Sequence, residues 1–189
     1  MENIDRVGKH IKSVLKMNGT LLENIPNVYF YTAMLSRDES RKLPATMRRY
    51  LIQETGYSDY ETFEFVGDAV YELVMAEIIY RNPILNMTSK NIVGNHARSN
   101  HLFSCLMQSK NLCSLTMPQK ECADKFEAIV GVVYTALEAG NYDSVSIIGQ
   151  WLTSVWDLEQ AYTSRTNTCD HLVKGNGTTL PKHEIDQFF

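Results

Sequence analysis

ETFEFVGDAVYEL, residues 61–73, is the most informative stretch of this chain. Its acids Glu61, Glu64 and Asp68 recur at positions i, i+3 and i+7, which share one face of a helix. Apolar residues stand between them, and helical apolar spacing continues over residues 59–80. The pattern predicts a helix that packs into a core while it carries a line of carboxylates.

A second acidic segment, ADKFEA, places Asp124 and Glu127 at i and i+3 of another helical pattern. Carboxylates that face one another among apolar residues repel and lose hydration, so they need positive charge nearby. Neither segment contains an arginine, and Lys125 lies about 100° around the helix from Asp124. Oxygen ligands favour hard cations, so the residues predict a Mg²⁺ site, with Mn²⁺ as the alternative ion.

These two segments carry a resemblance to a known family. Residues 61–73 closely resemble the signature of the ribonuclease III endonuclease domain, and residues 123–131 resemble its second acidic motif, in the same order. Weaker similarity extends from about residue 30 to about residue 156. The resemblance implies an all-α endonuclease domain that cleaves double-stranded RNA, leaves 5′-phosphate and 3′-hydroxyl ends with short 3′ overhangs, and works as a symmetric homodimer.

The resemblance also implies roles for single residues. The metal ligands would be Glu64, Asp68, Asp124 and Glu127, with Glu61 as a nearby catalytic acid. By the same resemblance Phe65 is an aromatic of the dimer interface, although an ordinary core phenylalanine fits the pattern equally well. Gly67 suits either a close approach of another helix or a kink, because glycine costs a helix about 1 kcal/mol relative to alanine.

Other functions stay open at this point. A non-catalytic RNA-binding or scaffold subunit of the same fold is the main alternative, but such relatives have lost acids that this chain keeps. A helical metal hydrolase of small phosphate esters would suit the acidic character, although it would not explain the ribonuclease signature. Thr62 replaces an arginine that is usual in the signature, and the segment 114–122 is short, which affects substrate handling more than chemistry.

Composition sets further limits. The chain has 189 residues, of which 44% are hydrophobic, and this predicts one globular domain over residues 1–160 and a polar tail over 161–189. The net charge of −4 and the lack of an evident double-stranded-RNA-binding domain predict weak RNA binding, and a separate RNA-binding partner protein is compatible with both. No apolar run is long enough to span a membrane, so we expect no membrane association. The N-terminus does not resemble a signal peptide and the cysteines form no paired motif, so we expect reduced thiols and a cytoplasmic or nuclear location.

The remaining helices are expected from apolar spacing and end signals. The spacing predicts helices over residues 3–17, 88–112 and 144–159, the second with Thr88 as its N-cap, and a fourth helix that opens with a capping box at Thr116–Gln119 and ends at Gly140. The apolar run 27–36 fits a strand or a helix by periodicity, and the family resemblance implies a helix. The main concentration of basic residues lies at 37–50, where Pro44 predicts a break.

Overall fold

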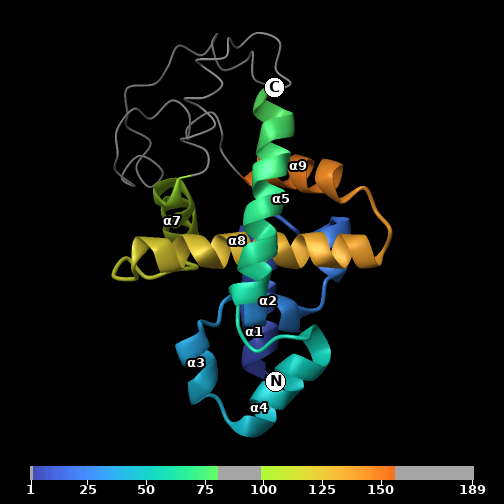
Figure 1. The fold of residues 1–189 in the computed structure, drawn as a ribbon. Helices are drawn as coiled ribbons and strands as arrows, with labels where there is room; N and C mark the ends of the chain where they lie inside the picture. The colour runs from blue at the N-terminus through green and yellow to red at the C-terminus, as the bar shows by residue number, and fades with distance from the viewer. Residues whose placement is uncertain (1, 81–98, 156–189) are drawn as a thin grey trace.

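The computed structural model describes residues 2–80 and 99–155, and in these two ranges the protein is all-α (Figure 1). Eight α-helices and one short 3₁₀ helix make up their regular structure, and they contain no strand. The expectation of an all-α fold is therefore confirmed for this part of the chain.

Two long helices form the centre of the molecule. Helix α5 (Glu61–Tyr80) runs across helix α8 (Gln119–Ala139), as Figure 1 shows. Every residue of α8 from Cys122 to Val133 is buried, which means that neighbouring elements cover this helix on all sides. The rings of Tyr71 on α5, Phe103 on α7 (Asn100–Ser109) and Phe126 on α8 pack together, so they join these three helices.

The crossing of α5 and α8 depends on two glycines. A Cβ atom on Gly67 would lie 1.8 Å from the carbonyl oxygen of Glu127, and one on Gly131 would lie 2.0 Å from the carbonyl oxygen of Phe63. These distances are far below van der Waals contact, so the two main chains touch where any side chain would separate them. The interpretation of Gly67 as a point of close helix approach is confirmed, whereas the matching role of Gly131 was not predicted.

The N-terminal elements pack beside this pair. Helix α1 (Glu2–Val14) is shorter than the predicted 3–17, because the chain turns at Lys16, whose φ is 56°. The 3₁₀ helix η1 (Leu21–Asn24) leads into α2 (Asn27–Ala33), so the run that periodicity left undecided is helical. Most of its aromatic and β-branched residues are buried, and tertiary packing therefore prevails over their strand propensity.

The basic segment forms two short helices, α3 (Arg37–Lys42) and α4 (Ala45–Thr55). Pro44 stands at the N-cap of α4, which confirms the predicted break. Ser36 and Glu39 form a capping box at the start of α3, with each side chain bonded to the other residue's backbone N–H. This cap fixes the start of α3 beside the beginning of α5 and α8.

One predicted helix start is wrong, and one predicted helix is not continuous. Helix α7 (Asn100–Ser109) begins after Ser99, which is extended (φ −82°, ψ 134°) and caps Leu102 N–H with its hydroxyl, so no continuous helix runs from 88 to 112. Thr88 and Pro83 lie outside the described residues. At α8, Pro118 occupies the N-cap without a side-chain hydrogen bond, so the capping box at Thr116 does not form, although the predicted end at Gly140 is confirmed.

Helix α9 (Ser144–Val155) begins where the sequence predicts, while residues 156–159 of that prediction and the tail 161–189 lie outside the described part. Trp151 Nε1 donates a 2.8 Å hydrogen bond to the carbonyl oxygen of Leu15, which ties α9 to the end of α1. None of the helices in the two described ranges is long and apolar enough to cross a membrane. Cys113 and Cys122 are free thiols as expected, but Cys105 is disulfide-bonded, so the expectation of reduced thiols is wrong there.

Candidate metal centre

Three of the predicted acids converge at the crossing of α5 and α8. Glu64 lies one turn before Gly67 on α5, while Glu127 lies at the crossing on α8 and Asp124 one turn before it. One carboxylate oxygen from each of the three residues lies within 4.8 Å of the other two. We call these three residues the carboxylate cluster. Asp124 and Glu127 are each only 8% exposed, so the cluster is anchored in the core.

The cluster holds more negative charge than its surroundings neutralise. Burial raises the pKa of Glu127 to about 8, and the charges of Asp68, Asp124 and Glu64 contribute to the rise. Burial and the charge of Asp124 also raise the pKa of Glu64. Within residues 2–80 and 99–155, no hydrogen bond or ion pair reaches the carboxylate of Glu64 or of Glu127. The site therefore favours an added cation or bound protons.

Among the residues that the structure describes, one cation reaches the cluster. Lys120 Nζ lies 2.8 Å from Asp124 Oδ1, across one turn of α8. Sequence reasoning missed this pair, although Lys at i and Asp at i+4 is a standard helical ion-pair spacing. Lys125, the lysine that the sequence placed away from the acids, instead lies 3.5 Å from Glu39 and 3.3 Å from Glu121, as measured between Nζ and the nearest carboxylate oxygen.

The structure places the other predicted residues outside the carboxylate cluster. Glu61 forms an ion pair with Arg37 of the basic segment. Asp68 is exposed on α5, and its charge still acts on Glu127. Phe65 is 76% exposed, so the interpretation as a core residue is wrong, and Leu73, which helical spacing grouped with the core, is 51% exposed on the same helix.

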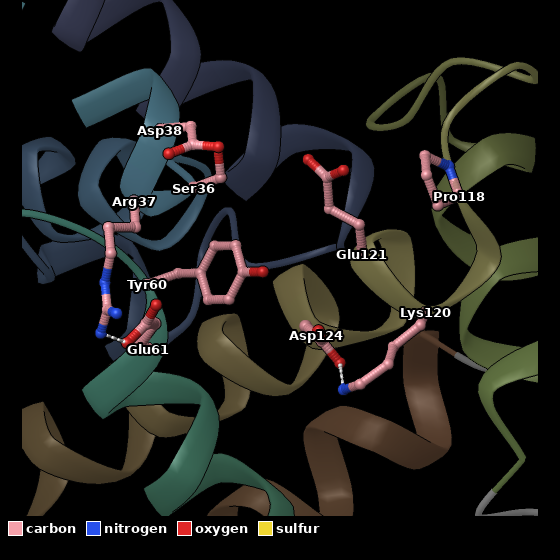
Figure 2. Close-up of a pocket in the computed structure, with 9 residues that line it drawn as sticks. All are labelled: Ser36, Arg37, Asp38, Tyr60, Glu61, Pro118, Lys120, Glu121 and Asp124. Carbon is pink, nitrogen blue, oxygen red and sulfur yellow. Dashed lines mark hydrogen bonds and ion pairs between the residues drawn. The ribbon is translucent and has the colours of Figure 1, made fainter. Parts of the chain in front are cut away.

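A hollow of about 520 Å³ opens beside the cluster (Figure 2). Residues from the start of α3, the start of α5 and the start of α8 line it. Figure 2 shows the Arg37–Glu61 and Lys120–Asp124 ion pairs in its wall, with the ring of Tyr60 between them in this view. Burial and four nearby carboxylates raise the pKa of Tyr60 to about 12, which indicates a negative potential inside the hollow.

The donor set fits a hard divalent cation. All three converging ligand atoms are carboxylate oxygens, and the described part of the cluster offers neither nitrogen nor sulfur. Mg²⁺ is commonly bound by a few carboxylates together with water, and Mn²⁺ accepts the same ligands. Glu127 is buried, and its carboxylate has no partner in the described ranges. Such an ion would therefore stabilise the charged form of Glu127 most.

Comparison with protein-family models, with curated proteins and with solved structures finds no match to this chain. The resemblance to ribonuclease III therefore depends on the two acidic motifs themselves.

Proposed function

We propose that the protein is a metal-dependent endoribonuclease of the ribonuclease III type that cleaves double-stranded RNA. One observation carries the proposal: Glu64 of the first motif and Asp124 and Glu127 of the second meet within 4.8 Å. The two motifs are distant in the chain, and they meet because paired glycines let α5 and α8 touch. Such a buried set of acids costs stability unless it binds a cation, which supports a functional role.

In the proposed reaction, Glu64, Asp124 and Glu127 would hold Mg²⁺ or Mn²⁺, and Asp68 would add negative charge from the adjacent turn of α5. The chemistry that such an ion would supply is activation of the attacking water and stabilisation of charge on the departing 3′ oxygen. Glu61 is held by Arg37 at the edge of the hollow, one turn before Glu64, and would be an auxiliary acid there rather than a direct ligand. The products would be 5′-phosphate and 3′-hydroxyl ends.

The direct test of this proposal is cleavage of long duplex RNA with Mg²⁺, with EDTA as the negative control. Glu127→Gln keeps the shape of the side chain but removes one negative ligand. We expect it to lower cleavage at least about 10²-fold, equivalent to about 2.7 kcal/mol of barrier. Glu54→Gln, an exposed glutamate of α4, is the matched control and should cleave as the wild type does. Full activity of Glu127→Gln would exclude the metal assignment.

The same proposal includes a homodimer, because a single site cuts one strand and a twofold pair cuts both. Phe65 and Leu73 are exposed on α5, two turns apart, with the exposed Ala69 between them, and this apolar line supports a self-complementary contact. A central aromatic often dominates such an interface, so Phe65→Ala should raise the dimer dissociation constant by at least about 30-fold, or about 2 kcal/mol. Sedimentation at micromolar concentration measures this, and a monomeric wild type that makes paired cuts would refute the dimer.

A non-catalytic RNA-binding or scaffold subunit is the second candidate, and one observation favours it. Lys120 and Arg37 already neutralise Asp124 and Glu61, as they would in a site that holds no metal. The cleavage assay separates the two candidates. A protein that binds duplex RNA in salt-sensitive fashion, and leaves it intact with either Mg²⁺ or Mn²⁺, would be the scaffold.

A further inference from the structure

We propose that Lys120 is a built-in counter-ion of the carboxylate cluster, and that a divalent cation enters the cluster only by displacing the Lys120 ammonium from Asp124. The inference deepens the proposed function and relies on it for one point, that the cluster is a metal site. In this view the Lys120 ammonium competes with the metal ion for Asp124, so the affinity for metal depends on Lys120 as well as on the ligands.

The geometry places the ammonium where it competes. Its Nζ is 2.8 Å from Oδ1 of Asp124, whose carboxylate is one of the three that converge in the cluster. The hydrogen bond to Asp124 raises the pKa of Lys120, and the charges of Asp124, Glu64 and Glu127 raise it further. Lys120 therefore bonds Asp124 directly and is attracted by the other two carboxylates at longer range, although it carries half the charge of Mg²⁺.

The same lysine is free to leave. Its side chain is 72% exposed, whereas the Asp124 side chain is only 12% exposed. It lies in the first turn of α8 and lines the open hollow of Figure 2, into which it can rotate without moving the helix. An exposed ammonium keeps much of its hydration and is held only weakly by one carboxylate. A divalent ion that binds three carboxylates would therefore displace it.

A second observation indicates that the cluster can bind a cation besides the Lys120 ammonium. Glu127 as a residue is only 8% exposed, its carboxylate is one of the three that converge, and that carboxylate has no hydrogen-bond or ion-pair partner in the described ranges. Lys120 hydrogen-bonds Asp124 and leaves Glu127 without a direct contact. The ammonium is thus an incomplete counter-ion, and a cation seated between the three residues would satisfy all of them.

The experiment measures Mn²⁺ binding to the full chain without RNA, by the loss of the electron paramagnetic resonance signal of free Mn²⁺ at constant pH. Lys120→Met removes the charge and keeps most of the stem, while Lys120→Arg keeps the charge. Lys9→Met, an exposed lysine of α1, controls for net charge. We expect Lys120→Met to bind Mn²⁺ about threefold to tenfold more tightly than the wild type, and the other two variants to bind with the wild-type affinity or more weakly. Circular dichroism confirms that each variant is folded.

Each outcome has one meaning. Equal affinity of Lys120→Met and the wild type, or weaker binding by the variant, would overturn the inference while the metal site stands. Tighter binding by Lys120→Arg as well would also overturn it, because the charge would then not be the cause. Absence of Mn²⁺ binding in every protein would overturn both the inference and the proposed function. Binding by Lys120→Met alone would support the competitor and contradict a metal-dependent activity of the wild type.

Discussion

Helix α8 carries two clusters of charged side chains, and they are built in opposite ways. In the first, the buried Lys125 lies between Glu39 and Glu121, so each of these carboxylates has a cation. In the carboxylate cluster, three acids share one exposed lysine, and Glu64 and Glu127 have no partner in the described ranges. The comparison indicates that the first cluster holds α3 against α8, whereas the second keeps unbalanced charge that only a further ligand can neutralise.

The pKa values of Glu39, in the first cluster, and Glu127, in the carboxylate cluster, shift in opposite directions. Although burial raises it, hydrogen bonds from Ser36 and the charge of Lys125 bring the pKa of Glu39 below its usual value. Burial and three neighbouring carboxylates instead raise the pKa of Glu127 to about 8. Folding therefore favours the charged form of Glu39, whereas it disfavours the charged form of Glu127. Strongly raised values of this kind are more frequent at functional sites than elsewhere, since most structural acids are paired.

The largest effect should come from separating the helices that build the carboxylate cluster. In Gly67→Ala the new methyl group would meet the main chain of Glu127 at 1.8 Å, which no side-chain rotation can relieve. We expect the free energy of unfolding in urea to fall by at least about 3 kcal/mol. Gly149→Ala is the matched control, because its Cβ would lie at an ordinary 3.6 Å from Val74 Cγ1. That variant should be unchanged or up to about 1 kcal/mol more stable.

The contrast between the two lysines gives the next effect. Lys125→Met leaves Glu39 and Glu121 without their shared cation and should lower the free energy of unfolding by about 2–3 kcal/mol, since a pair with a buried partner is broken. Lys120→Met removes an exposed ion pair and should cost less than about 1 kcal/mol. Urea denaturation of both variants measures the difference. Equal losses of stability would mean that both lysines stabilise the fold to the same extent, and would contradict the distinction between a structural cluster and a binding cluster.

The smallest effect concerns pH. Because the pKa of Glu127 is about 8 when folded and near the ordinary value when unfolded, the folded state binds more protons between these values. Stability must therefore fall as pH rises through that window. In EDTA, Glu127→Gln should melt about 2–4 °C above the wild type at pH 8.5, a shift of about 1 kcal/mol for this size, and the gain should shrink towards pH 5. A pH-independent difference would contradict the raised pKa, and Mg²⁺ should stabilise only the wild type.

The sequence predicted the elements that local pattern determines. Helices α5 and α8 were found because long apolar periodicity defines them, and Gly67 was recognised because glycine inside a helix needs a reason. Helix starts were less accurate. Pro118 stands at the N-cap of α8 where Thr116 was expected, and the break at Ser99 before α7 was not predicted, since several residues near each start can serve as caps and only packing selects one.

Contacts between different helices could not be predicted from the sequence pattern. Arg37 meets Glu61 because the start of α3 lies beside the start of α5, where Tyr60 N–H donates a hydrogen bond to the carbonyl oxygen of Leu35, and no spacing reveals this. The exposure of Phe65 and Leu73 follows from which side of α5 faces α8, and helical periodicity could not separate the two apolar sides of this helix. The Lys120–Asp124 pair has the i, i+4 spacing that a sequence shows, but Lys120 lies one turn before the second acidic motif and is not part of it.

The contact of main chain with main chain at Gly67 and Gly131 also restricts how the molecule can move. Two helices that meet through interlocking side chains can slide by exchanging rotamers, but peptide groups in direct contact have no rotamers to exchange. Sliding of α5 along α8 is therefore blocked. Any response to an arriving cation has to come from rotation of a few side chains, with Lys120 as the most exposed of them. The spacing of the acids is thus a property of the backbone, fixed before any ligand binds.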